Sequence, residues 1–267
     1  MTRVLLTLFC LLTMQLHAAA QDGTVPSAAL PVRNGLEQAQ WMGVQEGLEV
    51  IRTLTPDGVV FTGYRISPKH FTFAIRTQLS ETGSRAKEIG EQEGAVIVSN
   101  GGFFAVTGSG RLYPVGYFRM NGEVRSKGWH TAGGVVSFIE GQLRLSPTHA
   151  GIPSGEFDAF QSRPMLIEPG GKWAMGSNGG ISKVRTLLCT LETGDVILAV
   201  VSRAGMTLYE AGWLMRSRDE GGFFGCDAAI ALDGGRSTQI WHAGEPQYSV
   251  FGATPVYSFL VVRQRED

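Results

Sequence analysis

The chain has 267 residues, of which 43% are hydrophobic and 18% are charged, and its formal net charge is −1. A chain of this length and composition is long enough to bury a substantial core. Its charge balance excludes the broad basic surface that non-specific nucleic-acid binding requires, so we expect no nucleic-acid partner.

The N-terminus has the pattern of a signal peptide. Arg3 precedes an apolar run from Val4 to about Leu16, and the alanines at positions 18–20 form a small-residue cleavage site. The run is shorter than the roughly 20 residues that a membrane-spanning helix needs. We expect residues 1–20 to be removed, a periplasmic or secreted product, and no stable membrane insertion afterwards. An uncleaved anchor is the alternative.

Two cysteines remain in the expected mature chain. Cleavage removes Cys10 and leaves Cys189 and Cys226. Disulfides persist in export compartments, so a bridge between them is one interpretation. Because both lie among apolar neighbours, a pair of buried thiols is the other. No histidine cluster lies near them to indicate a zinc site.

After the signal, the sequence predicts an arm followed by a strand-rich domain. Residues 21–45 contain prolines and glycines without a sustained period, which indicates a linker or a loosely docked N-terminal arm. From residue 46 to 267 we expect one α+β (mixed α/β) domain, with a mixed sheet and a few helices. Its short β-type runs are LEVIRTL, GVVFTGYRI, FTFAIRTQL, GAVIVS, GYFRM, GGVVSFIEG, QLRLS, DVILAVV, AAIAL and YSFLVV.

Two segments have helical character. Residues 80–94 are polar and suit an exposed helix, whereas residues 206–219 carry apolar side chains at helical spacing. Thr207 and Glu210 have the spacing of a capping box at the start of the second segment. The order of VILAVV, this helix and AAIAL predicts a crossover between two parallel strands.

Two strand ends share one design. VIVSNGGFF (96–104) and IALDGG (230–235) are both apolar runs that end in Asn or Asp followed by two glycines. Glycine pairs permit a sharp bend and a close approach by a ligand. Either turn alone has an ordinary structural explanation, but the two together predict that Asn100 and Asp233 meet at one site.

These motifs also carry a resemblance. The chain contains, in order, VIVSNGGFF, PVGYFRMNGEV, QSRPMLIEPGG, KVRTLLCTLETGDVILAVV, MTLYEAGWLM and AAIALDGGRSTQIW. Over roughly residues 48–262 this set resembles the phosphodiester glycosidase family, which includes a lysosomal enzyme and exported bacterial proteins. Two positions depart from the family pattern: Arg236 stands where LDGGGS is common, and Arg163 precedes Pro164 where a smaller residue is expected.

The resemblance implies an exported hydrolase that cleaves the sugar–phosphate bond of a glycosyl 1-phosphodiester. Because phosphate is a good leaving group, this cleavage depends less on a general acid than cleavage of an ordinary glycoside does. Binding of the phosphate anion requires cations and N–H donors. Arg185 is the first candidate for the phosphate contact, and Arg236 and His130 are the next. The substrate is then a small molecule or glycan that carries a sugar phosphodiester.

Asp233 is the main candidate for the catalytic carboxylate, either at the anomeric carbon or as the group that activates water. Burial would raise its pKa and a neighbouring arginine would lower it. A two-carboxylate scheme needs a partner. Asp227 and Glu210 are the candidates for it, although Glu210 already has a role as a helix cap.

The remaining candidates would bind the substrate. We expect Asn100 to contact sugar hydroxyls or to orient the phosphate, and Ser237 to supply a donor. The glycines of the two turns would leave the backbone open: Gly101, Gly102, Gly234 and Gly235. No cofactor is certain, but a calcium or magnesium ion held by Asp233, Asp227 and carbonyl oxygens stays open. The rival hypothesis is a non-catalytic periplasmic protein that binds a sugar phosphate or envelope glycan.

Overall fold

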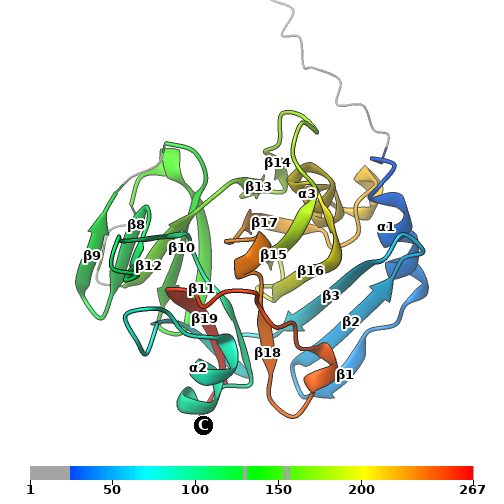
Figure 1. The fold of residues 1–267 in the computed structure, drawn as a ribbon. Helices are drawn as coiled ribbons and strands as arrows, with labels where there is room; N and C mark the ends of the chain where they lie inside the picture. The colour runs from blue at the N-terminus through cyan, green and yellow to red at the C-terminus, as the bar shows by residue number, and fades with distance from the viewer. Residues whose placement is uncertain (1–24, 129–130, 153–154, 156, 267) are drawn as a thin grey trace, which may run out of the picture.

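The fold is built mainly from antiparallel sheets. The computed structural model describes residues 25–128, 131–152, 155 and 157–266, so the expected signal peptide, residues 1–20, lies outside the described residues. Within them, nineteen strands form an eight-stranded, a five-stranded, a four-stranded and a two-stranded sheet. Figure 1 shows the five-stranded sheet to one side of the large sheet and the four-stranded sheet with α2 below.

The large sheet positions most of the predicted site. In spatial order its strands are β1 (Met42–Gln45), β2 (Leu48–Leu54), β3 (Val59–Ile66), β16 (Val196–Met206), β15 (Lys183–Leu191), β17 (Cys226–Ala231), β13 (Met165–Glu168) and β14 (Lys172–Trp173). The central strands β16, β15 and β17 each contain a run of consecutive buried residues because both faces of the sheet are covered there.

The smaller sheets complete the other half of the molecule. The five-stranded sheet has the order β11 (Gln142–Pro147), β10 (Gly134–Ile139), β12 (Asp158–Ser162), β8 (Tyr117–Met120) and β9 (Glu123–Lys127). The four-stranded sheet has the order β18 (Ile240–His242), β5 (Ile97–Asn100), β19 (Ser258–Gln264) and β4 (Phe71–Thr77). The hairpin consists of β6 (Phe104–Val106) and β7 (Leu112–Pro114).

The expected mixed sheet is wrong in one respect. Every strand pair in the described residues is antiparallel. The predicted crossover is present, because β16 and β17 run in the same direction and α3 (Leu208–Met215) lies between them in sequence. However, β15 is inserted between these two strands and is antiparallel to both. The protein is therefore mostly β, with three α-helices in the described part.

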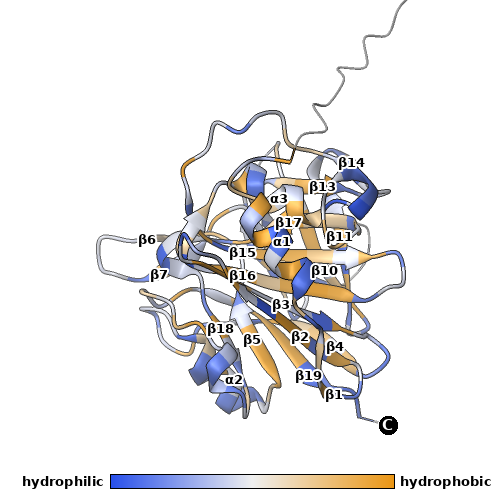
Figure 2. Ribbon diagram, turned by 90° about the vertical axis from the view of Figure 1, so that its right-hand side faces the viewer, coloured by the Kyte–Doolittle hydropathy of each residue, from blue (hydrophilic) through white to orange (hydrophobic). Residues whose placement is uncertain are grey.

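Alternate residues along the strands of the large sheet pack into two separate hydrophobic cores, one on each face. Leu188 of β15 packs with the smaller sheets, whereas its neighbours Leu187 and Cys189 pack under the helices. Figure 2 shows α1 and α3 on the near face of the large sheet, whose strands are mainly hydrophobic. None of the helices in the described residues is long and apolar enough to cross a membrane.

The segment expected to be a linker or loose arm is largely part of the fold. Residues Leu30–Gln38 form α1, with Val32 and Leu36 buried in the core beneath the helices. Burial of two such side chains contributes on the order of 3–6 kcal/mol before entropic costs. The expected boundary at residue 46 also separates β1 from β2, although these strands pair with each other. The sequence does not predict α1 because Pro31 and Gly35 interrupt its helical spacing of apolar residues.

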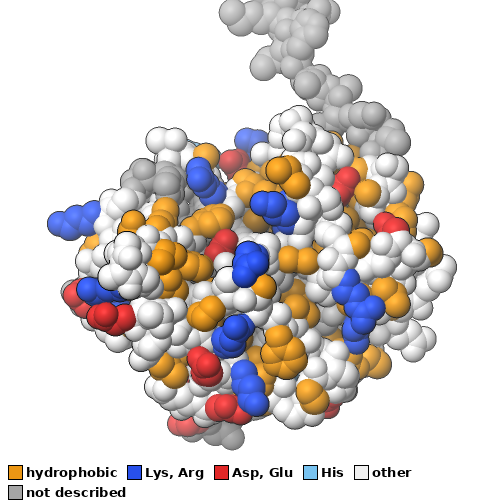
Figure 3. Space-filling model, in the orientation of Figure 1, with side chains coloured by type: hydrophobic (Ala, Val, Ile, Leu, Met, Phe, Trp, Pro, Cys, Tyr) orange, Lys and Arg blue, Asp and Glu red, His pale blue; other side chains and the backbone are white. Residues whose placement is uncertain are grey.

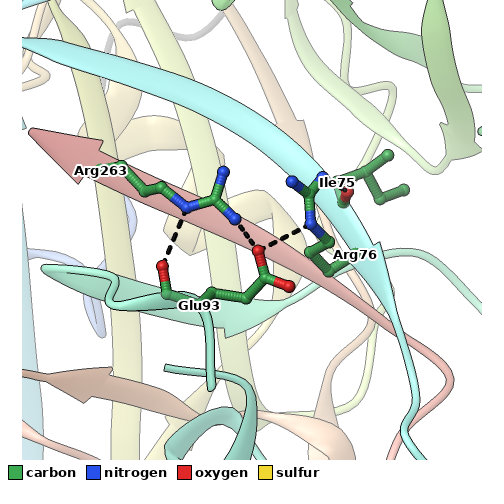
Figure 4. A network of polar contacts seen from close by, with 4 residues as sticks. All are labelled: Ile75, Arg76, Glu93 and Arg263. Carbon is green, nitrogen blue, oxygen red and sulfur yellow. Dashed lines mark hydrogen bonds and ion pairs between the residues drawn. The ribbon is translucent and has the colours of Figure 1, made fainter. Parts of the chain in front are cut away.

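The first expected helix, over residues 80–94, is the shorter helix α2, and ion pairs hold its C-terminal end. It spans Ala86–Glu93. The Glu93 carboxylate accepts a hydrogen bond from Arg76 Nε at 2.8 Å and pairs with Arg263 Nη2, while the Glu93 carbonyl accepts a bond of 3.1 Å from Arg263 Nε (Figure 4). Because Arg76 lies on β4 and Arg263 on β19, this network ties α2 to the four-stranded sheet.

Candidate active site

The two predicted turns meet in the structure. β5 ends at Asn100 and β17 is followed by Asp233, and these strands belong to different sheets. Asn100 Nδ2 donates a hydrogen bond of 2.7 Å to the Asp233 carbonyl, and the Asp233 N–H donates one of 3.1 Å to the Gly101 carbonyl. The two Gly-Gly turns are therefore joined directly, which confirms that Asn100 and Asp233 lie together.

Asn100 serves as an internal brace rather than as an open ligand group. Its side chain is fully buried. Besides the bond to Asp233, its Oδ1 accepts hydrogen bonds from Thr186 Oγ1 at 2.7 Å and from the Gln239 N–H at 3.0 Å. These bonds connect the strand ends of both sheets, so Asn100 fixes the position of the Asp233 turn.

The two glycine pairs have different roles. A Cβ on Gly101 would lie 2.7 Å from Ser258 Oγ, and one on Gly102 would lie 2.7 Å from a ring carbon of Phe160. These two glycines are thus required by close packing within the protein and do not open the backbone to a ligand. Gly234 and Gly235 are only partly buried, and Gly235 has a φ of 61°, a left-handed conformation that favours glycine.

Asp233 lies half-buried in a polar turn, two residues after the end of β17. The Gly234 N–H donates a hydrogen bond of 2.9 Å to Asp233 Oδ1, and the buried Ser237 side chain also donates to this carboxylate. Burial raises the pKa of the Asp233 carboxyl, and the bonds from Ser237 and Gly234 partly oppose that rise. The carboxyl therefore holds a proton more readily than an exposed aspartate.

Arg185 lies beside this turn on the neighbouring strand. A Cβ on Gly234 would be 3.9 Å from Arg185 Nη1. The guanidinium is fixed by carbonyls, since Nε donates to Met206 O at 3.0 Å and Nη2 donates to Ile181 O at 2.6 Å. Burial lowers its pKa, and no carboxylate of the described residues forms an ion pair with it.

Two further cations lie at the same edge. Lys183 was not predicted, and its Cδ would lie 4.0 Å from a Cβ on Gly235. Arg163 was noted only as a departure from the family pattern, but it precedes Pro164, whose carbonyl accepts a bond of 3.0 Å from the Ala231 N–H. The sequence signal for Lys183 was its position two residues before Arg185 on the same strand.

Glu210 and Asp227 lie in different places. Glu210 Oε2 accepts a hydrogen bond of 2.8 Å from the Thr207 N–H, and the Glu210 N–H donates one of 3.1 Å to Thr207 Oγ1. This confirms the capping box and leaves the carboxylate occupied at the start of α3. Met206, whose carbonyl binds Arg185, directly precedes this cap, so Glu210 lies on the Arg185 side of the site.

Asp227 is wrongly placed for a role beside Asp233. It stands at the start of β17 and accepts a hydrogen bond of 3.0 Å from the Gly170 N–H. Six residues of extended chain separate it from Asp233, which is about 20 Å at the rise of a strand. Paired carboxylates of glycosidases are at most about 10 Å apart. The distance also excludes a cation shared by Asp227 and Asp233.

Of the two weaker candidates for the phosphate contact, the structure describes only Arg236. His130 lies outside the described residues. Arg236 is exposed in the turn after Gly235, and its carbonyl accepts bonds from the Ala253 and Thr254 N–H groups. No group of three or more His, Cys, Asp or Glu side chains in the described part is arranged to hold a metal ion.

The site is distinguished by its chemistry and not by the size of a cavity. A concavity of about 610 Å³ lies between residues 77–81, 111–114 and 123–125, and neither Asp233 nor Arg185 lines it. The joined turns are the better candidate site because they combine a carboxyl whose pKa is raised by burial with a cation that has no carboxylate partner among the described residues. Groups with shifted pKa values are typical of functional sites.

A disulfide supports the strands that carry the site. Cys189 of β15 and Cys226 of β17 are bridged, which selects the first of the two interpretations of these residues. Arg185 lies on β15 and Asp233 is the second residue after β17. The bridge therefore fixes the two site-bearing strands to each other at the end remote from Asp233.

Solved structures share this fold at low sequence identity. A hypothetical protein from Synechocystis matches with a TM-score of 0.60 and 15% identity over 85% of this chain, and this chain spans 64% of the length of that protein. The zebrafish N-acetylglucosamine-1-phosphodiester alpha-N-acetylglucosaminidase catalytic domain, auto-inhibited by its pro-peptide, matches with a TM-score of 0.60, 14% identity and coverage of 85% and 88% of the two chains.

A third solved structure is a Burkholderia pseudomallei protein named as a candidate exported protein, with a TM-score of 0.53, 12% identity and coverage of 77% of this chain and 74% of that one. No curated protein matches the chain. The family model for phosphodiester glycosidases, in contrast, matches residues 93–263, which include both Gly-Gly turns, Arg185 and α3. The chain therefore belongs to the phosphodiester glycosidase family.

Proposed function

We propose that this protein hydrolyses the bond between the anomeric carbon of a sugar and a phosphate oxygen in a glycosyl 1-phosphodiester. The observation that carries the proposal is the position of the Arg185 guanidinium beside Gly234, the residue that follows Asp233. The family supports a hydrolase of this general kind. The name of the zebrafish neighbour specifies an N-acetylglucosamine 1-phosphodiester, which makes an N-acetylhexosamine the first sugar to test.

In the proposed reaction, a water oxygen forms a bond to the anomeric carbon as the bond from that carbon to the phosphate oxygen breaks. The electron pair of the broken bond stays on the phosphate oxygen. The products are the free sugar, a phosphomonoester dianion and one proton. The negative charge on the phosphate thus increases by one during the reaction.

Arg185 is suited to stabilise this increase in charge. Its guanidinium is held by two carbonyls next to Gly234, and no described carboxylate pairs with it. A partly buried cation of this kind interacts more strongly with the developing dianion than with the monoanionic substrate. Such a difference lowers the barrier, because only interactions that strengthen in the transition state accelerate the reaction.

Asp233 is suited to accept the proton of the attacking water. Burial raises the pKa of its carboxyl, which makes the ionised form a better base than an exposed aspartate. The Gly234 N–H and Ser237 orient the carboxylate. Because phosphate leaves without prior protonation, this scheme does not require a second carboxylate as a general acid.

The proposal is tested by measuring the release of free sugar from a panel of sugar 1-phosphodiesters, with Asp233→Asn as the variant. We expect the variant to lose about a hundredfold or more of kcat, the usual contribution of general base catalysis. Asp227→Asn is the matched control, since it makes the same change at the other end of β17. Equal activity of wild type and Asp233→Asn would refute the role of Asp233.

The same assays test the alternatives that the sequence leaves open. Binding of a sugar phosphate by calorimetry without turnover of any member of the panel would favour the non-catalytic binding protein. Assays with and without a chelator test a divalent cation. Export to the periplasm or medium is a part of the proposal, supported by the signal-peptide pattern and by the disulfide, and fractionation of cells that express the full chain tests it.

A further inference from the structure

At the edge of the large sheet near Asp233, cations lie on β15, in the turn after β17 and just before β13. β17 lies between β15 and β13. Leu187 pairs with Ala231, and the Leu232 N–H donates a bond of 2.9 Å to the Thr186 carbonyl, so the register brings Arg185 level with Asp233. On the other side, the bond from the Ala231 N–H to the Pro164 carbonyl brings Arg163 to the same edge.

The cations on the β15 side follow the turn in order. Arg185 Nη1 lies beside Gly234, and Lys183 Cδ lies beside Gly235. Arg236 is the next residue of the turn. Both Lys183 and Arg236 are exposed, so their ammonium and guanidinium groups are available to a ligand. A chain of groups that extends from Asp233 along the turn would meet Arg185 first and Lys183 with Arg236 second.

These cations have no carboxylate partners in the part of the chain that the structure describes. None of Arg163, Lys183, Arg185 and Arg236 forms an ion pair with a carboxylate of the described residues. The chain as a whole has a net charge of −1, so this local excess is not a property of the entire surface. In Figure 3, Lys and Arg side chains follow one another down the middle of the face over β15, β17 and β18.

The number of charges exceeds what the proposed reaction requires. Asp233, the capping residue Glu210 and one phosphodiester supply at most three negative charges. They stand against the four positive charges of Arg163, Lys183, Arg185 and Arg236. Concentrated like charges repel one another unless a counter-ion binds. The excess on the Gly235 side therefore indicates a ligand that carries negative charge beyond the phosphate bound at Arg185.

We infer that the substrate carries a second anionic group in its leaving portion, one position beyond the scissile phosphodiester, and that Lys183 and Arg236 bind it. This inference rests on the proposed function and narrows its substrate class. A diphosphate, as in a nucleotide sugar, and a further phosphate along a polyol phosphate chain present the same chemistry. Lys183 and Arg236 then determine specificity, whereas Arg185 contacts the scissile phosphate.

The test compares three substrates with the same sugar: the methyl phosphodiester, the nucleoside diphosphate ester and the phosphoglycerol ester that bears a terminal phosphate. We expect kcat/KM to be at least tenfold higher for one of the two charged leaving groups than for the methyl ester, and the better of the two identifies the source. The ratio of kcat/KM for the better charged ester to kcat/KM for the methyl ester measures this preference. Lys183→Gln and Arg236→Gln should each reduce this ratio about 2- to 5-fold, as expected for partly exposed charge pairs. Raising the salt concentration should reduce it as well.

Arg144→Gln is the matched control, because Arg144 is exposed on β11 near the Asp227 end of the sheet and should leave the ratio unchanged. A ratio within twofold of one in the wild type overturns the inference while the proposed function stands. A ratio of tenfold or more that neither Lys183→Gln nor Arg236→Gln alters also overturns it.

A binding measurement separates failure of the inference from failure of the proposed function. Calorimetry with inorganic pyrophosphate and with methyl phosphate needs no turnover. If no sugar phosphodiester is cleaved, but pyrophosphate binds at least tenfold more tightly than methyl phosphate and Lys183→Gln removes the difference, the anion site stands and the proposed function fails. Absence of both turnover and selective binding overturns both.

Discussion

Replacement of Asn100 by alanine tests whether this residue joins the two halves of the site. The side chain is fully buried and makes hydrogen bonds of 2.7 Å to Thr186, 3.0 Å to the Gln239 N–H and 2.7 Å to the Asp233 carbonyl. Alanine leaves all three partner groups without a bond. At about 1–3 kcal/mol for each of the three unsatisfied groups, the free energy of unfolding should fall by about 3–9 kcal/mol.

This loss is a large part of the total stability of about 5–15 kcal/mol that is typical of a domain. The measurement is urea denaturation followed by circular dichroism, supported by the shift in Tm, which should fall by roughly 2–4 °C for each kcal/mol in a chain of this size. Asn178→Ala is the matched control, because Asn178 also bonds two side chains, Thr207 and Glu210, but is exposed. Water can replace its bonds, so we expect a loss below about 1 kcal/mol.

The reasoning is refuted if Asn100→Ala and Asn178→Ala destabilise the protein equally. It is also refuted if Asn100→Ala is strongly destabilised but retains wild-type kcat, since the Asp233 turn would then not depend on the Asn100 brace.

Three further predictions concern the elements around the site. Glu210→Gln and Thr207→Ala should each lower stability by about 1 kcal/mol in urea denaturation through weakening of the cap of α3, and a loss of kcat above tenfold in Glu210→Gln with intact folding would instead show a catalytic role. Replacement of Cys189 and Cys226 together by alanine should lower stability by about 4 kcal/mol, from the 37-residue loop that the bridge closes; an unchanged urea midpoint would contradict this. Because burial raises the pKa of Asp233, its neutral form favours folding below about pH 4 and that contribution is lost as pH rises through the raised pKa. Asp233→Asn should therefore have a higher Tm than wild type at pH 7 and the same Tm near pH 3, and the opposite order at pH 7 would refute the shift.

The sequence predicts the strands well because their apolar runs are strong local signals. It does not predict how they pair, because pairing depends on contacts distant in sequence. The order of VILAVV, α3 and AAIAL implies two parallel strands, yet nothing local shows that β15 inserts between them. Helix α1 was missed for a different reason: its stability comes from burial of Val32 and Leu36, while its composition resembles a linker.

The site is predicted in part for similar reasons. The repeated Asn/Asp-Gly-Gly design correctly brings Asn100 and Asp233 together, since both lie where a buried strand ends. It does not show that the Asn100 amide is consumed by internal bonds, or that Ser258 and Phe160 require Gly101 and Gly102 to lack side chains. The prediction that Asp227 acts beside Asp233 is wrong because the two residues are joined by extended chain. Residues a few positions apart along a strand lie far apart in space.

The most direct test of the central claim is hydrolysis of a sugar 1-phosphodiester in water enriched in oxygen-18, followed by phosphorus NMR of the product. The account predicts a phosphomonoester without the heavy isotope, because water attacks the anomeric carbon and the phosphate keeps its own oxygen. It also predicts that Asp233→Asn abolishes the reaction. Incorporation of oxygen-18 into the phosphate would show cleavage of the phosphorus–oxygen bond and contradict the proposed function.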